Sequence, residues 1–345
     1  MQISYSKPLD HAWHRMKAFL FQPFDLGKWF VLGFTAWLAD LAGGSSGSAS
    51  EQLRISEDLN KSQVRDWYGG GLDFLGDVFS HPWALLLAGM IMLGVIAIGL
   101  LVLWISSRGR FMFLDNLVHT RTEVKAPWTE FQSQGDSLFL WQVVYSIIVF
   151  VVIGSLFVGG LMLLVPLAAL DTPPVATVPL IILAGTAMFV LITTLVFVEF
   201  FLTQFVVPIM YRHRISATEA WRRFLPLFKE HPGSFVLFGL FYFGIVVVGG
   251  ILYLAGGLLT CCIGLILMAI PYIGTVITLP LHTLAKFLSL EFLGQFGDDF
   301  RLLQPWPEEP VHPYDSNEIQ GDGTMVGPQD PGEDPGGGQP GPENF

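Results

Sequence analysis

The feature that most restricts the fold of this chain is a set of long apolar runs without charged residues. The run from Ser234 to Leu259 has 26 residues and contains no Asp, Glu, Lys or Arg. At about 1.5 Å per residue, a helix of that length exceeds the ~30 Å hydrocarbon core of a bilayer. Because 52 % of the chain is hydrophobic and 14 % is charged, the sequence predicts an all-α integral membrane protein.

A basic amphipathic helix is predicted directly before this run. Residues Ser216 to Glu219 form a capping box, whose Ser and Glu side chains bind the free amides at a helix start. One apolar face follows at helical spacing: Trp221, Phe224, Leu225 and Phe228. The cations Arg222, Arg223 and Lys229 lie elsewhere on the helix. We expect this helix to lie on the membrane surface and to end at Pro232.

Six membrane crossings are predicted in a domain that covers residues 1–300. They are residues 27–43, 82–107, 138–170, 178–210, 234–259 and 261–296. The first run is short and is either a complete crossing or a re-entrant segment. The last contains Pro271 and Pro280, so we expect a kinked helix that gives way near His282 to an amphipathic end.

Two further segments complete this membrane domain. Residues 44–81 begin with a Gly- and Ser-rich stretch and carry mixed charges, so they are predicted to be the one large external loop. Residues 11–22 are predicted to be a first surface helix, capped by Asp10 and ended by Pro23. Its inward residues should be Trp13, Met16 and Leu20, with His14 and Arg15 facing outward.

The distribution of Lys and Arg predicts the orientation. Under the six-crossing interpretation, fifteen of the 18 Lys and Arg residues lie on one side, and Arg54, Lys61 and Arg65 lie on the other. Cytoplasmic loops carry the excess of Lys and Arg in multipass proteins. Both termini are therefore predicted to be cytoplasmic, in a bacterial inner membrane.

The C-terminal segment differs in composition from the membrane domain. From residue 298 to the end there are eleven Asp or Glu residues against one Arg, so this stretch accounts for most of the net charge of −11. Residues 301–345 are rich in Pro and Gly, cannot bury a core, and are predicted to be a disordered acidic tail. The rest of the chain is nearly neutral, which argues against a nucleic-acid partner.

A short motif recurs where three predicted spans return to the cytoplasm. It has the pattern F-L-x-[N/Q]-[L/F]-[V/G] at residues 113–118, 201–206 and 292–297, spaced 88 and then 91 residues apart. The segments Ala12-Trp13-x-Arg15 and Ala220-Trp221-x-Arg223 also resemble each other. Together these similarities predict three pseudo-repeated helical hairpins with cytoplasmic interfacial helices, at roughly residues 1–118, 119–206 and 207–297.

Ionisable residues inside or near the spans are the candidate site residues. They are Arg110, Glu199, His282, Lys286 and Glu291. An ionisable group near the hydrocarbon is costly and must face a partner, so such groups mark candidate sites. The alternative is structural: Glu199 and Glu291 pair with Arg110 or Lys286 and hold the helices together. The structural interpretation is preferred because both carboxylates are expected near the interface, where the cost is small.

No pattern in the chain predicts an enzyme. The metalloprotease, hydrolase, phosphate-loop and dinucleotide-binding spacings do not occur. His11 and His14 share a helix face but lack further metal ligands, and the adjacent Cys261 and Cys262 suit neither a disulfide nor a metal site. No cofactor or metal is therefore expected.

Two features of the sequence resemble a known group of proteins. They are the Ala-Trp-x-Arg helix and the segment from Ser107 to Asp115, which reads Ser-Arg-Gly-Arg-Phe-Met-Phe-Leu-Asp. These features resemble bacterial multipass membrane proteins that include the membrane domain of glycerophosphoryl diester phosphodiesterase. The resemblance covers roughly residues 1–300 and implies a membrane domain. In such proteins the phosphodiesterase chemistry belongs to a separate soluble barrel, which does not fit in this chain, so no catalytic residue carries over.

These observations predict a non-enzymatic inner-membrane protein, a scaffold or interaction partner in membrane or envelope organisation. Its expected partners are the lipid bilayer and either another membrane protein or further copies of the chain. The alternative is a small transporter or permease component that uses the intramembrane carboxylates. A membrane enzyme ranks third.

Overall fold

The computed structural model describes residues 4–43, 80–169, 174–260 and 263–305. Residues 1–304 form one compact unit and residues 305–345 a second. Most of the predicted external loop, the cysteine pair and residues 306–345 of the predicted disordered tail lie outside the described residues. Within the described ranges, the regular secondary structure is entirely helical.

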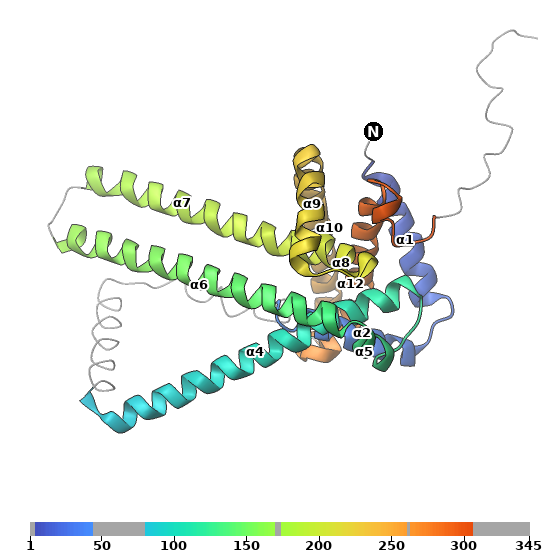
Figure 1. Ribbon diagram of the computed structural model, residues 1–345, viewed down its shortest axis with the longest axis horizontal. Helices are drawn as coiled ribbons and strands as arrows, with labels where there is room; N and C mark the ends of the chain where they lie inside the picture. The colour runs from blue at the N-terminus through green and yellow to red at the C-terminus, as the bar shows by residue number, and fades with distance from the viewer. Residues whose placement is uncertain (1–3, 44–79, 170–173, 261–262, 306–345) are drawn as a thin grey trace, which may run out of the picture. The chain divides into compact units, whose positions relative to one another are not determined.

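The helices of the first unit are shown in Figure 1. They are α1 (Ser6–Phe21), α2 (Leu26–Asp40), α4 (Pro82–Val118), α5 (Lys125–Glu130), α6 (Gln132–Ala169), α7 (Pro174–Phe201), η2 (Leu202–Val206), α8 (Val207–His213), α9 (Ala217–Glu230), α10 (Pro232–Leu259), α11 (Ile263–Ala269), α12 (Pro271–Gly294) and η3 (Asp298–Phe300). The segments α7, η2 and α8 follow one another without a break, and η2 is a turn of π-helix.

Among the described residues, five helical segments are long and apolar enough to cross a membrane. These segments are Pro82–Val118, Gln132–Gly160, Val178–His213, Pro232–Leu259 and Pro271–Gly294. The predicted first crossing corresponds to α2, which is 15 residues long and therefore extends only about 22 Å. That length is less than the ~30 Å hydrocarbon core, and α2 is not among the five.

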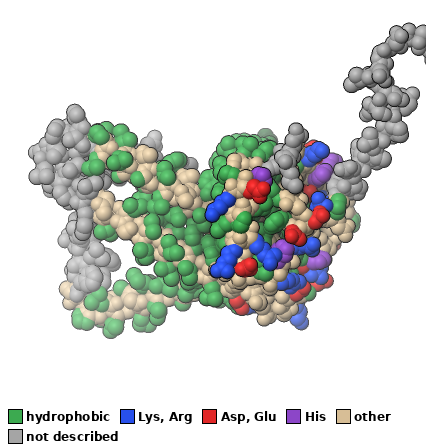
Figure 2. All heavy atoms as spheres, turned by 45° about the horizontal axis from the view of Figure 1, so that its top comes forward, with side chains coloured by type: hydrophobic (Ala, Val, Ile, Leu, Met, Phe, Trp, Pro, Cys, Tyr) green, Lys and Arg blue, Asp and Glu red, His purple; other side chains and the backbone are tan. Residues whose placement is uncertain are grey.

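The long helices have an exposed outer part and a packed inner end. In α4, no residue from Pro82 to Ile105 is buried, whereas most residues from Ser106 to Leu117 are buried. In Figure 1, α6 and α7 run side by side and α4 diverges from them. Figure 2 shows charged side chains gathered over the packed end and apolar side chains covering the outer helices. The exposed part of α4 is about 36 Å long, which suits a bilayer.

Helix α12 is the element on which the packed end is built. It contacts α1, α2, α10 and η2, and every residue from Thr283 to Leu290 is buried. The predicted kinked span is divided at Pro271, because α11 ends at Ala269 and α12 begins at Pro271, whereas Pro280 lies inside α12. The predicted amphipathic end beyond His282 is wrong, because neighbouring helices cover that part of α12 on all sides.

Helices α1 and α2 lie along α12 in opposite senses. Helix α1 runs antiparallel, since Ser4 bonds to Gln295 and the ring of Phe19 contacts that of Phe287. Helix α2 runs in the same sense as α12, because Gly33 packs on Val276 and Asp40 pairs with His282. The two helices therefore form a hairpin whose second arm turns back along α12.

The start of the chain differs from its predicted form in three ways. Trp13, which was expected to face inward, is 51 % exposed. Helix α1 begins at Ser6, so Asp10 lies inside the helix and does not cap it. The side chain of Arg15, which was expected to face outward, is 16 % exposed and pairs with Glu291 of α12. The helix ends at Phe21, before Pro23, as predicted.

Helix α9 begins at the predicted capping box, with the Ser216 side chain accepting a bond from the Glu219 amide over 3.4 Å. Its central apolar residue, Phe224, is fully buried. The Phe224 ring stacks on Phe205 of η2 at 5.7 Å and meets Phe235 of α10 edge-on at 5.3 Å. The expectation that this face lies on the membrane surface is therefore wrong at Phe224, where protein covers it.

Candidate functional site

The five candidate site residues do not form a single cluster. Arg110 pairs with Glu199, His282 with Asp40, and Glu291 with Arg15, while Lys286 donates to the backbone carbonyl of Thr203. Glu199 thus pairs with Arg110 as the structural interpretation expects. Glu291 does not pair with Arg110 or Lys286, because α1 brings Arg15 to it.

The Arg110 pair joins α4, α6 and α7. The guanidinium of Arg110 donates to the Glu199 carboxylate over 2.9 Å, with side-chain exposures of 7 % and 37 %. The Gln142 amide lies 2.7 Å from the Ser107 hydroxyl, and its oxygen, when turned toward Arg110, accepts from the guanidinium over 2.9 Å. The buried guanidinium therefore has a counter-ion and a second acceptor, which a buried charge requires.

Lys286 lies at the π-helical turn. Its ammonium donates to the Thr203 carbonyl of η2 over 2.6 Å, and the residue is 8 % exposed. Within the described residues, no carboxylate lies within ion-pair distance of Lys286. A π turn displaces backbone groups from the regular α-helical ladder and often marks a functional position. Here one of its carbonyls serves as the acceptor for a buried cation.

The next residue of that turn binds two other helices. Gln204 donates to the Tyr242 hydroxyl of α10 over 3.0 Å and accepts from the Ser289 hydroxyl of α12 over 2.9 Å. Both partners are internal protein groups. The polar side chains at η2 therefore join α7, α10 and α12.

The start of α1 is fixed to the end of α12. The Arg15 guanidinium lies 2.5 Å from the Glu291 carboxylate, and His11 lies 3.6 Å from the other carboxylate oxygen. Ser4 and Gln295 exchange two hydrogen bonds of 3.0 Å, in which the Gln amide pairs with the Ser backbone. A charged pair and an amide pair thus hold the two ends of the membrane domain together.

A buried carboxylate in α4, Asp115, is a site that the sequence interpretation missed. Its side chain is 1 % exposed and accepts from Arg121 over 2.7 Å and from the Tyr211 hydroxyl over 2.8 Å. His119 lies 2.9 Å away. The hydrogen bond to Asp115 raises the pKa of Arg121. The sequence did contain a signal for this site. Asp115 occupies the third position of the first repeated motif, where a carboxylate follows several apolar residues.

The amide residue of the repeated motif is similarly bonded in two of its three copies. Asn116 exchanges two hydrogen bonds of 3.0 Å with the backbone of Glu123, in the same way as Gln295 does with Ser4. Gln204 differs, because its partners are the side chains of Tyr242 and Ser289. In the first and third copies, the amide fixes a neighbouring segment of backbone.

The polar groups at the packed end hold helices together through internal bonds. In the part of the chain that the structure describes, no three His, Cys, Asp or Glu side chains could together hold a metal ion. The two apolar cavities described at α10 are not lined by any of the five candidate residues. These internal hydrogen bonds and ion pairs therefore hold the charged side chains in fixed positions where the packed end meets the outer helices.

The chain was compared with protein families, curated proteins and solved structures. Residues 6–303 match a family that is described as a family of unknown function (DUF7544). No curated protein and no solved structure matches the chain. Nothing in these comparisons links the chain to glycerophosphoryl diester phosphodiesterase.

Proposed function

The chain belongs to the DUF7544 family of unknown function, and we propose that it is a non-enzymatic scaffold of the bacterial inner membrane. In this role its long helices hold other membrane proteins, or further copies of the chain, in position. The observation that carries the proposal is the contrast along α4, α6 and α7. Their inner ends are locked by compensated charges, whereas their outer parts present apolar faces that the described protein does not cover.

The inner ends of the long helices are held together by bonded charged side chains, which suits the rigid part of a scaffold. Arg110 is bonded to Glu199 and Gln142, and Lys286 is bonded to backbone. A transport site needs ionisable groups that exchange partners with a substrate or a proton in a cavity. Here the partners are protein groups, so the geometry supports a structural role for these charges.

The outer parts supply the proposed association surface. Phe150 of α6 is 79 % exposed and Phe189 of α7 is 70 % exposed. Helices α6 and α7 are tied by a 2.7 Å bond from the Tyr145 hydroxyl to the Leu195 carbonyl, so they present a joint face. Lipid provides no hydrophobic driving force between helices, and association there depends on close packing with another helix.

The proposed orientation places the packed end and both termini in the cytoplasm. It is supported by the position of the cations, since fifteen of the 18 Lys and Arg residues lie outside residues 44–81. The pairing of Ser4 with Gln295 puts the start of α1 beside the end of α12. The hairpin formed by α1 and α2 favours the re-entrant alternative for residues 27–43.

The proposed threefold repetition is supported by burial. The Phe-Leu pair of the motif is buried in each copy, with exposures of 6 % or less at residues 113 and 114, and at residues 292 and 293. Phe201 is 8 % exposed and Leu202 is fully buried. Each pair lies near the end of a helix that returns to the packed end. The first hairpin departs from this repetition at α2. As an outgoing helix, α2 should run antiparallel to the returning helix α12, but it runs in the same sense.

A photo-cross-linking amino acid placed on opposite faces of α6 tests the scaffold role. Phe150 and Ile148 are two residues apart, so their side chains point about 200° apart around the helix, and both are exposed. A docked helix covers one face, so we expect a discrete protein adduct in native membranes from one of these positions and not from the other. Lipid adducts alone from both positions, and from Phe189 of α7, would contradict the proposal.

A transporter component is the second candidate function. The buried Lys286 at a π turn favours it, as do the carboxylates Glu199 and Glu291. Flux across liposomes that depends on Glu199 would support this candidate. A membrane enzyme is third, and hydrolysis of a lipid phosphodiester that is lost on changing Glu199 or Glu291 would support it.

A further inference from the structure

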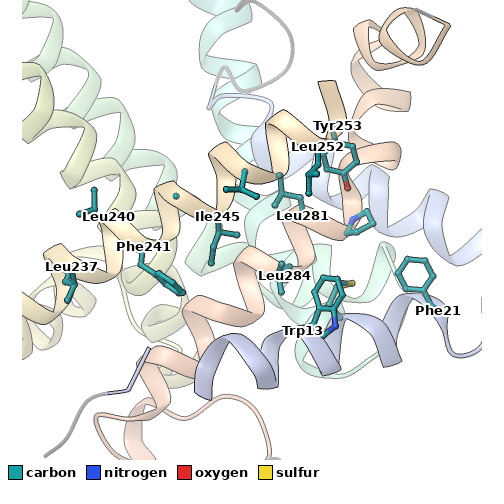
Figure 3. A pocket seen from close by; sticks show the side chains of 15 residues that line it. Trp13, Phe21, Leu237, Leu240, Phe241, Ile245, Leu252, Tyr253, Leu281 and Leu284 are labelled. Atoms are coloured by element: carbon teal, nitrogen blue, oxygen red, sulfur yellow. The ribbon is translucent and has the colours of Figure 1, made fainter. Parts of the chain in front are cut away.

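A large apolar groove lies between α1, α10 and α12. Its volume is about 930 Å³, and Figure 3 shows its labelled side chains. Trp13 and Phe21 line it from α1, Leu237 and Tyr253 mark its two ends on α10, and Leu284 lines it from α12. Because α10 and α12 are both candidate membrane helices, the groove is in contact with lipid in the proposed arrangement.

The dimensions of the groove suit one acyl chain. The distance from Leu237 to Tyr253 along α10 is about 24 Å at the rise of an α-helix. One leaflet contributes about half of the ~30 Å hydrocarbon core, so a single chain fits within that length. Two glycines shape the α10 wall. Gly249 lets α10 approach Leu281 closely, and Gly244 lines the groove without any neighbour within 4 Å.

By helical spacing, the cation Lys17 lies on the face of α1 that borders this groove, although Lys17 is not among the residues that line it. Lys17 is four residues from Trp13 and four from Phe21, and all three therefore share one face of α1. Trp13 and Phe21 line the groove, while Lys17 is exposed. In the described part of the chain, Lys17 has no ion-pair partner. Its aliphatic stem suits the apolar wall and its ammonium suits a phosphate at the interface.

We propose that this groove binds one acyl chain of an anionic glycerophospholipid, whose phosphate lies at Lys17. The occupant is a lipid because the walls are apolar over their whole length and the adjoining charge is positive. The acidic segment of residues 306–345, rich in Pro and Gly, is unsuited to such walls. This binding is independent of the scaffold role.

A photoactivatable phosphatidylglycerol with a diazirine on its acyl chain tests the groove, in nanodiscs of phosphatidylcholine that contain the full-length protein. We expect adducts on the peptide from Leu237 to Tyr253 and on the peptide that contains Trp13. The variant Gly244→Leu should lower this labelling about tenfold, because its side chain takes up volume needed by the acyl chain. The control is Gly250→Leu, on the same helix with nothing within 4 Å and outside the groove lining. It should label as the wild type does.

The headgroup is tested with the variant Lys17→Gln. We expect the preference for phosphatidylglycerol over a phosphatidylcholine probe of the same chain to fall about fivefold, since one cation at an anionic surface contributes about 1 kcal/mol. Lys7→Gln changes an exposed cation on the same helix and should leave that preference unchanged.

Three outcomes would overturn the proposal. The first is labelling of the groove no stronger than that of the outer face of α6. The second is equal loss of labelling in Gly244→Leu and Gly250→Leu while both variants remain folded. The third is a cross-link between two protein chains through the groove, which would make the occupant a helix.

Discussion

Gly109→Val should destabilise the protein by about 3 kcal/mol or more, at the upper end of the cost of overpacking. A β-carbon at Gly109 would lie 2.7 Å from the Leu38 carbonyl carbon and 2.8 Å from the Ala39 amide nitrogen. These are backbone atoms of α2, which cannot move aside as a flexible side chain can. The added methyl groups of Val would force α2 away from α4 and break the Ser106 bond to the Ala39 carbonyl.

The matched control is Gly99→Val, on the same helix at a position with nothing within 4 Å. It should change the unfolding free energy by less than about 0.5 kcal/mol, as exposed substitutions usually do. Thermal unfolding of both purified variants in detergent measures the difference. If Gly109→Val unfolds at the wild-type temperature, α2 does not pack on α4 as described.

Glu199→Gln should destabilise the protein by about 2 kcal/mol. The substitution removes the counter-ion of Arg110, which is 7 % exposed. The cost is below the ~3–5 kcal/mol of a fully buried pair because Glu199 is 37 % exposed and partly solvated. Glu219→Gln is the control. It changes surface pairs of 3.8 and 4.0 Å on α9 and should cost less than about 1 kcal/mol.

The variant Glu199→Gln also distinguishes a structural role of this carboxylate from a role in transport. Proteoliposomes that contain the wild type or Glu199→Gln are loaded with a pH-sensitive dye and subjected to a proton gradient. We expect both to leak at the rate of empty liposomes. Flux through the wild type that disappears in a Glu199→Gln protein of unchanged stability would instead support the transporter alternative.

Local patterns predicted most of the helices. The apolar runs predicted the five long helices because length and hydropathy alone define a candidate span. The capping box predicted the start of α9, since a cap depends on residues only three positions apart. The break at Pro271 followed from the missing amide of proline.

Contacts between distant segments were not predictable from those patterns. The partner of Glu291 is Arg15, 276 residues away in sequence, and no local rule relates them. Phe224 has the spacing of a membrane-surface helix, but an apolar face packs equally well on protein. The sense of α2 depends on the contacts of Gly33 and Asp40 with α12, which hydropathy does not encode.

The candidate site was predicted in its residue types and in the pairing of Glu199 with Arg110. The partners of Glu291, His282 and Lys286 were not predicted. Arg110 and Glu199 were identified because ionisable groups are rare in apolar runs. Asp115 was missed because it lies beyond residue 107, where the predicted crossing ends, and a carboxylate there is expected to be solvated. The π turn at Thr203 was not predictable, because nothing in the residue types there distinguishes it from regular helix.

The central claim is that the packed, charged end of the molecule faces the cytoplasm while the outer helices cross the bilayer. Accessibility labelling of single cysteines, after replacement of Cys261 and Cys262 by Ser, tests it most directly. A membrane-impermeant maleimide should label Ser48→Cys, in the predicted external segment, in intact cells. Arg222→Cys, on α9 with its native side chain 81 % exposed, should be labelled only after the membrane is opened. Labelling of Arg222→Cys in intact cells would contradict the account.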